Sequence, residues 1–143
     1  DKVHIGKICE FISGFAFSSN DYVKENGVKL LTIKNIRNNT IDLLNATLLP
    51  QEYKESFNSY LIKRGDIVIA MTGATIGKCA MFDIDAEVLL NQRVGIIRVF
   101  ENVNPIYLSV YLNLKPFQLE IMQKSCGGAQ PNISADEIKK LKN

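Results

Sequence analysis

Histidine, tryptophan and cysteine are scarce in this chain of 143 residues, which contains one histidine, no tryptophan and three cysteines. A serine or cysteine nucleophile generally needs a positioned general base, and the single histidine, at position 4, is a poor candidate. A structural zinc site needs four ligands, usually including a closely spaced pair, and the cysteines provide no such pair. We therefore expect neither a metal site nor hydrolase chemistry of this kind.

The three cysteines are too few and too far apart to suggest a disulfide framework. They lie among apolar or small residues, at Cys9, Cys79 and Cys126. This pattern predicts buried, reduced thiols in an intracellular protein.

Long hydrophobic runs are absent as well. The longest apolar stretches, such as 67–71 and 94–97, fall far short of the roughly 20 residues that cross a bilayer as a helix. The chain begins Asp1-Lys2-Val3-His4, without a methionine or an apolar signal core, which predicts an excised piece or a processed chain. We expect a cytoplasmic protein with no membrane association.

Charge of one sign is also lacking, because 17 basic residues face 15 acidic ones and leave a net charge of +2. A pI near 8.4 is below that of a protein that coats nucleic acid. The basic residues are nevertheless clustered: segment 24–37 has four against one acidic residue, and segment 63–78 has three against one. Solvated surface lysines would explain these clusters equally well.

Hydrophobic residues make up 46% of the chain and charged residues 22%, which is typical of one globular domain. In its first half, residues 28–33 are predicted to form a strand, 34–39 a polar turn and 40–44 a second strand, giving a hairpin with a basic tip. Pro50 suits the first turn of a helix, which is predicted to run to Phe57.

Residues 67–71 form the clearest predicted strand. The glycine-containing loop 72–78 follows them, then a strand that ends at Phe82, and 94–100 forms a further strand. Apolar residues of these strands are expected in the core, together with one from the first hairpin: Ile33, Ile67, Ile69, Val94 and Ile96.

Helical periodicity appears only in the last third of the chain. Pro105 and Pro116 each suit the start of a helix, and Ser134 with Glu137 forms a capping box for a helix that continues through 138–143. Strands followed by helices predict an α+β fold.

The loop that ends in Gly77-Lys78 invites comparison with a nucleotide phosphate loop. The comparison fails because three residues separate Gly73 from Gly77 instead of four, and because Cys79 replaces the hydroxyl residue that would bind Mg²⁺. A glycine-rich loop beside a lysine can still hold a phosphate oxygen, including one of DNA. An ordinary loop between antiparallel strands is the competing interpretation.

Two polar segments could read DNA bases. Lys34-Asn35-Ile36-Arg37 at the predicted hairpin tip and Asn91-Gln92-Arg93 carry the amide and guanidinium groups that pair with adenine and guanine. Both segments could also be solvated turns.

Taken together, several ordered pieces of the chain resemble the target-recognition domain of a type I restriction-modification specificity subunit. The pieces are Cys9-Glu10-Phe11-Ile12-Ser13-Gly14-Phe15-Ala16-Phe17, Leu31-Thr32-Ile33-Lys34-Asn35-Ile36, Lys63 to Lys78, Leu90-Asn91-Gln92-Arg93-Val94 and Gly127-Gly128-Ala129-Gln130-Pro131-Asn132-Ile133-Ser134. The resemblance covers nearly the whole chain.

The resemblance implies a non-catalytic DNA reader with a mixed, strongly twisted, barrel-like β core and flanking helices. In this family each of two such domains reads one half of a bipartite site, while separate subunits methylate adenine and cleave or translocate DNA. This chain has one domain, so a second recognition domain or a homodimer partner is expected, besides the methyltransferase and restriction subunits. Residues 1–133 are expected to form the domain and 134–143 the start of a helix leading to a spacer helix.

The resemblance and the loop chemistry together predict a DNA-binding face and no cofactor. Lys78 is expected on a phosphate and Asn35 or Gln92 on a base edge. The predicted DNA-binding residues are Lys34, Asn35, Arg37, Thr72, Gly73, Thr75, Lys78, Asn91, Gln92, Arg93 and Gln130.

Two alternatives remain open at this point. One is a small enzyme that processes nucleotides or phosphate esters with the loop from Gly73 to Lys78. The other is a protein-interaction module that makes no contact with DNA.

Overall fold

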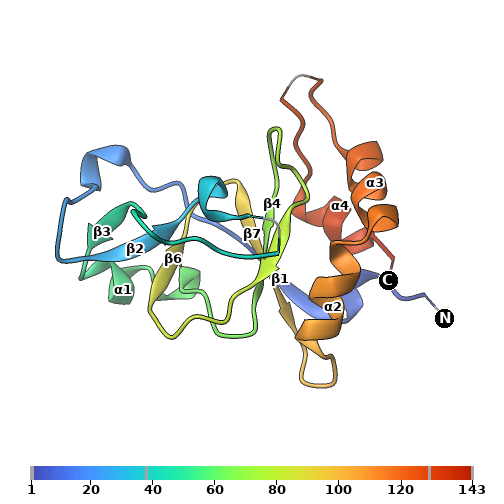
Figure 1. The fold of residues 1–143 in the computed structure, drawn as a ribbon, viewed down its shortest axis with the longest axis horizontal. Helices are drawn as coiled ribbons and strands as arrows, with labels where there is room; N and C mark the ends of the chain where they lie inside the picture. Colours follow the sequence, from blue (N-terminus) through green and yellow to red (C-terminus); the bar gives the residue numbers. More distant parts are fainter. Residues whose placement is uncertain (1, 38, 129, 143) are drawn as a thin grey trace.

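A computed structural model describes residues 2–37, 39–128 and 130–142. Figure 1 shows an elongated molecule with strands at one end and in the middle, and with helices and both termini gathered at the other end. Three residues of predicted features lie outside the described residues: Asn38 of the polar turn, Ala129 of the Gly-Gly-Ala-Gln piece and Asn143 of the last predicted helix.

A four-stranded antiparallel sheet occupies the middle of the molecule. Its strands lie in the order β1 (Cys9–Ser13), β7 (Val94–Val99), β4 (Ile67–Ala70) and β5 (Cys79–Met81). The strands predicted at 67–71, through Phe82 and at 94–100 are thereby confirmed within one residue at their ends.

A second, three-stranded sheet forms the other end of the molecule, in the order β3 (Leu48–Pro50), β2 (Gly27–Leu31) and β6 (Val88–Leu90). β2 pairs antiparallel with β3 but parallel with β6, so this sheet is mixed. Because β6 lies in this sheet and β7 in the other, the turn 91–93 carries the chain from one sheet to the next.

All four residues of β4 are buried. Because successive side chains of a strand point to opposite faces, β4 is covered on both faces. Ile67 and Ile69 pack toward the helices, while Val68 and Ala70 pack toward the second sheet. Full burial of an isoleucine side chain contributes about 1.5–3 kcal/mol, so this strand anchors both halves of the core. Of the predicted core residues, Ile67, Ile69, Val94 and Ile96 are fully buried, and Ile33 is half-buried.

Three helices cover the outer face of the four-stranded sheet: α2 (Pro105–Leu112), α3 (Lys115–Lys124) and α4 (Ala135–Lys140). Pro105 is the first residue of α2, as predicted, and the Asn104 side chain caps this helix by accepting from the backbone N–H of Ile106 at 2.9 Å.

α4 begins as predicted, because the Ser134 hydroxyl accepts from the backbone N–H of Glu137 at 3.1 Å. The prediction of a continuous helix through 138–143 is wrong, because Leu141 is extended and α4 ends at Lys140. Ile138 and Leu141 are fully buried in the core shared with the four-stranded sheet, so α4 packs as part of this unit.

The segment between β2 and β3 differs from the predicted hairpin. Residues 33–35 form a short 3-10 helix, η3 (Ile33–Asn35), and residues 40–44 form no strand beyond the single bridge between Ile36 and Ile41. The strand that pairs with β2 is β3, which ends at Pro50, so the helix predicted from Pro50 starts later, as α1 (Tyr53–Ser56). Further 3-10 helices are η1 (Ile5–Lys7), η2 (Ser19–Asp21) and η4 (Asn58–Tyr60).

The fold is therefore α+β with a mixed second sheet and flanking helices, as predicted, and the described strands form two sheets without closing into a barrel. Within the described residues, no helix has the length and apolar character needed to cross a membrane.

Candidate nucleic-acid interface

The β4–β5 loop, residues 72–78, projects beyond the end of β4 (Figure 1). Gly73 and Gly77 have φ of +79° and +88°, a backbone conformation that favours glycine and lets the loop reverse direction. The Gln118 side chain of α3 donates to the carbonyl oxygen of Gly77 at 2.8 Å and also to that of Leu112 at 2.8 Å. The helical layer therefore fixes the base of the loop, a role for Gln118 that no sequence motif indicated.

The chain between α3 and α4 lies against this loop. The backbone N–H of Gly73 donates to the carbonyl oxygen of Pro131 at 2.8 Å, and that of Ile133 donates to the carbonyl oxygen of Met71 at 3.0 Å. The Thr72 hydroxyl also donates to Pro131, at 3.1 Å. Two segments about 60 residues apart in sequence are thus held side by side.

The turn 91–93 joins the same assembly. The backbone N–H of Met71 donates to the carbonyl oxygen of Arg93 at 2.9 Å, and that of Asn91 donates to the carbonyl oxygen of Leu31 at 3.0 Å. Arg93 has a φ of +68°, in the left-handed region that residues other than glycine seldom adopt. Its side chain is exposed, as is that of Gln92.

η3 places the fourth polar segment. The Asn35 side-chain oxygen accepts from the backbone N–H of Thr32 at 2.8 Å, and the Asn35 side-chain nitrogen donates to the carbonyl oxygen of Asp42 at 3.0 Å. Both ends of the amide are therefore used inside the loop. The neighbouring Lys34 and Arg37 are exposed.

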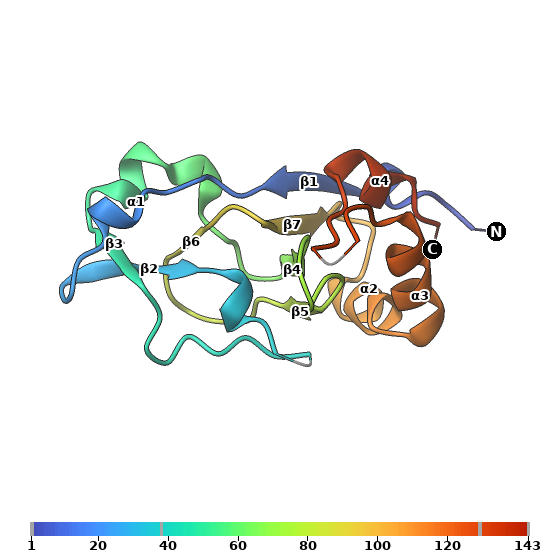
Figure 2. The same ribbon diagram turned by 90° about the horizontal axis from the view of Figure 1, so that it is seen from above.

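These segments enclose two hollows on either side of the β4–β5 loop. The first, which we call the Arg93 cleft, has a volume of about 680 Å³. It is lined by Ser13, Met71, Thr72, Arg93, Val94, Gln130, Asn132 and Ile133. The second, the Lys78 groove, has a volume of about 470 Å³. It is lined by Ile33, Lys34, Ile36, Arg37, Thr75 and Lys78. Figure 2 looks from above at this side of the molecule, with the β4–β5 loop near its centre.

Seven of the eleven predicted DNA-binding residues line one of these hollows. Thr72, Arg93 and Gln130 lie in the Arg93 cleft, and Lys34, Arg37, Thr75 and Lys78 lie in the Lys78 groove. The other four are placed between or beside them: Gly73 in the loop, Asn35 in η3, and Asn91 and Gln92 in the turn.

The face carries net positive charge because its cations have few acidic neighbours. Within the part of the chain that the structure describes, the ion pairs join Arg37 to Asp42 at 3.8 Å and otherwise involve cations outside the two hollows. Lys34, Lys78 and Arg93 have no ion-pair partner among these residues. Their charges are therefore available to an anion.

The geometry of the loop does not match a nucleotide-hydrolysing site. The loop connects two antiparallel strands, and a strand, not a helix, follows Lys78. Cys79 points into the core, and burial raises the pKa of its thiol from 9.0 to about 12, so the thiol stays neutral at ordinary pH. The described residues also contain no group of three or more histidine, cysteine or carboxylate side chains that could hold a metal ion.

Comparison with known proteins places this arrangement in a family. A family model described as the type I restriction modification DNA specificity domain matches residues 1–142. The chain belongs to this family. We refer to it below as the specificity domain.

Two curated relatives and a solved structure agree with this assignment. The type I restriction enzyme MjaVIII specificity subunit of Methanocaldococcus jannaschii is 30% identical over 145 residues, which cover 98% of the specificity domain and 34% of the relative. The type I restriction enzyme EcoAI specificity subunit of Escherichia coli is 25% identical over 139 residues, 94% of this chain and 23% of the relative. The HsdS subunit of Thermoanaerobacter tengcongensis has the same fold, with a TM-score of 0.72 at 16% identity, over 99% of this chain and 32% of that one. The specificity domain thus spans about a third or less of these proteins.

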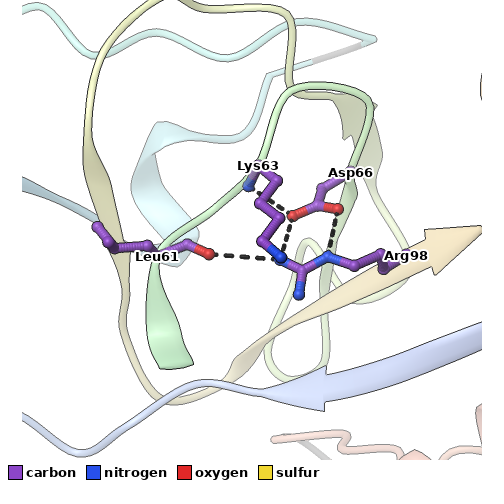
Figure 3. Close-up of polar contacts among 4 residues, drawn as sticks. All are labelled: Leu61, Lys63, Asp66 and Arg98. Atoms are coloured by element: carbon purple, nitrogen blue, oxygen red, sulfur yellow. Dashed lines mark hydrogen bonds and ion pairs between the residues drawn. The ribbon is translucent and has the colours of Figure 1, made fainter. Parts of the chain in front are cut away.

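A partly buried ion pair joins β7 to the residue that precedes β4 in the specificity domain. The Arg98 guanidinium donates two hydrogen bonds to the Asp66 carboxylate, at 2.9 and 2.8 Å, and a third to the carbonyl oxygen of Leu61 at 3.3 Å (Figure 3). The backbone N–H of Lys63 also donates to Asp66, at 2.7 Å. Hydrogen bonding to Asp66 raises the pKa of Arg98. This pair accounts for the aspartate of the Gly65-Asp66 piece, which has a structural role.

The cysteines differ in burial. Cys9 and Cys79 are buried as predicted, but Cys126 is exposed because it lies just after α3, where the segment between α3 and α4 begins. The Asn91 side-chain oxygen is buried and has no hydrogen-bond partner among the described residues. Asn132 and Ser13 line the Arg93 cleft but were not predicted as binding residues, although both belong to the pieces that carry the family resemblance.

Proposed function

We propose that this specificity domain binds double-stranded DNA through the face that contains the Arg93 cleft and the Lys78 groove. The observation that carries the proposal is the convergence of four separate segments, with the cations Lys34, Lys78 and Arg93, on one side of the molecule. DNA phosphates are met by such cations and hydroxyls, and base edges by amides and guanidinium groups.

We further propose that the domain reads one half of a bipartite DNA site and performs no catalysis itself. The assignment to the specificity-domain family supports this proposal, as does the similarity to curated relatives that are specificity subunits of type I restriction enzymes. In this proposal adenine methylation and DNA cleavage belong to partner methyltransferase and restriction subunits in the cytoplasm.

A second recognition domain, on the same polypeptide or on a homodimer partner, completes the proposed site. The chain spans 34% of the MjaVIII relative, which leaves room for a second unit of this size in proteins of that length. A net charge of +2 also suits a half-site reader, because few phosphate contacts give weak binding that falls steeply with salt.

Titration of the isotope-labelled chain with a short duplex of mixed sequence, followed by amide NMR spectra at low salt, tests the DNA-binding proposal. NMR detects the weak binding expected of one domain, with a Kd on the order of 10⁻⁴ to 10⁻⁶ M. Amide signals of 33–37, 72–78, 91–93 and 130–133 should shift, while those of α2 should stay in place. Lys78→Glu should weaken binding to every sequence, and Lys7→Glu in η1, outside both hollows, serves as the control. Shifts confined to α2, or no shifts at all, would contradict the proposal.

Capture with an adenine methyltransferase subunit, followed by sequencing of methylated sites, tests the proposed partners. The chain should co-purify with the methyltransferase and should direct methylation to sites that share a common half-sequence. Methylation at the same positions without the chain would show that the enzyme selects its sites by itself.

A further inference from the structure

Resting on the proposed function, we propose that the two hollows divide the work of DNA recognition. The Lys78 groove holds the phosphate backbone and contributes no sequence preference. The Arg93 cleft reads base edges, with Arg93 as the specificity-determining residue that recognises a guanine. The two roles follow from differences in chemistry between linings that lie on opposite sides of one loop.

The Lys78 groove has the composition of a phosphate site. Lys34, Arg37 and Lys78 provide three cations and Thr75 a hydroxyl, and no carboxylate lines the groove. The Arg37 charge is only partly offset, because its ion pair with Asp42 is long, at 3.8 Å, and both side chains are exposed. Lysine binds phosphate as a mobile point charge that is indifferent to base identity. The lining provides no amide that could distinguish one base from another, and its one guanidinium, that of Arg37, already lies beside the Asp42 carboxylate.

The Arg93 cleft has a different composition, with one cation, two amides and an apolar floor. Arg93, Gln130 and Asn132 supply a guanidinium and two amides, and none of their side chains has a hydrogen-bond partner among the described residues. The hydroxyls of Ser13 and Thr72 also line the cleft, and that of Thr72 is bonded to Pro131. Arginine pairs with the O6 and N7 atoms of guanine through two parallel hydrogen bonds, and amides pair with adenine. Met71, which is half-buried, lies in the same cleft, where an apolar side chain can meet a thymine methyl group.

The backbone at Arg93 is held in a defined conformation, which fixes the point from which the side chain extends. Its φ of +68° costs a residue with a side chain about 1 kcal/mol or more, and such conformations persist only where neighbouring structure enforces them. Here the carbonyl oxygen of Arg93 accepts from Met71, and the carbonyl oxygen of the next residue, Val94, accepts from the backbone N–H of Gly14 at 3.0 Å. Both donors directly follow strands of the central sheet, Met71 after β4 and Gly14 after β1. Arg93 is thus presented from a rigid turn, so its backbone loses little freedom on binding.

Gly14 adds a steric constraint to the same turn. A Cβ atom at this position would lie 1.7 Å from the backbone oxygen of Asn91, so the turn packs directly on the backbone after β1. The turn is therefore fixed by β1 on one side and by the end of β4 on the other. None of the residues that line the Lys78 groove has a positive φ, and the cations Lys34 and Arg37 are exposed there while Lys78 is half-buried.

Selection from a randomised duplex library at low salt, with sequencing of the bound fraction, separates the two roles. Arg93→Lys keeps the charge but removes the planar fork, and Lys78→Gln removes a charge from the groove. Arg93→Lys should reduce the preference for one G·C pair about 10- to 100-fold and leave binding to unrelated sequences nearly unchanged. Lys78→Gln should lower the affinity for all sequences and reduce the salt dependence by about one phosphate contact, with the preferred sequence unaltered.

Two additional variants keep the inference testable. Lys7→Gln, with the same change in charge outside both hollows, should behave like the unsubstituted chain. If Arg93→Lys does not fold, Gln130→Ala tests the same cleft from the opposite loop and should weaken the preference at one base pair. Unchanged preference in Arg93→Lys or, if that variant is unfolded, in Gln130→Ala would overturn the inference, as would a change at one base pair in Lys78→Gln. If the unsubstituted chain binds no DNA, the proposed function itself fails, which is a distinct result.

Discussion

The Arg98 guanidinium forms a bidentate ion pair with the Asp66 carboxylate. Asp66 is almost completely buried, with 2% of its surface exposed. A buried charge of this kind is tolerated only when its oxygens are satisfied. Asp66 accepts bonds from both Arg98 and the backbone of Lys63, so the pair connects the entry of β4 to the last residues of β7.

Removing the carboxylate charge should therefore destabilise the domain. Asp66→Asn leaves Arg98 without its anion, and we expect the free energy of unfolding to fall by about 3 kcal/mol in urea titrations. The exposed pair between Arg64 and Asp83, at 2.8 Å, is the matched control, and Asp83→Asn should cost less than about 1 kcal/mol. Equal effects of the two substitutions would show that burial of Asp66 does not control the loss.

Asn35 should behave as a structural residue of η3. Asn35→Ala removes the bonds to Thr32 and Asp42 and should lower the free energy of unfolding by about 1 kcal/mol. Asn20→Ala in η2, where the side chain makes no hydrogen bond among the described residues, is the control and should have little effect. The sequence suggested instead that Asn35 reads a base. A variant of full stability that loses preference at one base pair would restore that role.

Gly14 should tolerate no side chain. Gly14→Ala would press a methyl group against the backbone of Asn91, which cannot rotate away, and we expect a loss of at least about 2 kcal/mol in unfolding free energy. Ser13→Ala, at the exposed neighbouring position, should change it by less than about 0.5 kcal/mol. An amide spectrum of Gly14→Ala should show its largest changes at 91–93. Unchanged signals there would contradict the close packing of the turn on β1.

The thiols should separate by reactivity and by pH dependence. Exposed Cys126 should react with a thiol reagent in the folded chain, whereas Cys9 and Cys79 should react only on unfolding. Burial raises the pKa of Cys79 from 9.0 to about 12, so between these values the unfolded chain loses a proton that the folded chain keeps. Stability is therefore highest below pH 9 and should fall as pH rises, by about 1 kcal/mol per unit from this thiol.

Unfolding titrations from pH 8 to 11 test this contribution. Cys79→Ser should be less stable at every pH but should lose stability less steeply with rising pH, while Cys126→Ser should retain the original slope. If the free energy of unfolding fell equally steeply with pH in the unsubstituted chain and in Cys79→Ser, the Cys79 thiol would not be the cause of the fall. Other groups titrate in this range in all three chains, so only the difference in slope is informative.

The sequence was most informative where one interaction dominates. Four apolar residues in a row predicted β4, because a strand buried on both faces has no polar positions. Pro105 predicted the start of α2, and Ser134 with Glu137 predicted that of α4, because these helix starts depend on neighbouring residues alone. The end of α4 was missed because the extended backbone at Leu141 follows from its burial against distant strands.

The pairing of β2 and the arrangement of the loops could not be predicted from the sequence. β2 pairs with β3, about 20 positions further along the chain, and with β6, about 60 positions further along. The predicted hairpin chose a nearer partner at 40–44 and was wrong. Most of the predicted binding residues do line the two hollows, since polar residues near glycine rarely fill cores. Their division into two sets depends on the side of the β4–β5 loop that each one occupies. Asn35 carries an amide of the kind that reads a base. Only the structure shows that this amide is bonded to Thr32 and Asp42 within the loop.

The loops of the proposed DNA face are joined largely through main-chain atoms. Met71 donates to Arg93, Ile133 donates to Met71 and Gly73 donates to Pro131, and each bond uses a backbone N–H and a carbonyl oxygen. Almost any amino acid can supply these groups, so side chains such as Gln92, Gln130 and Asn132 can be exchanged while the loops keep their positions. A scaffold of this kind lets new binding preferences arise by substitution at the surface, without the compensating changes that a redesigned core would require.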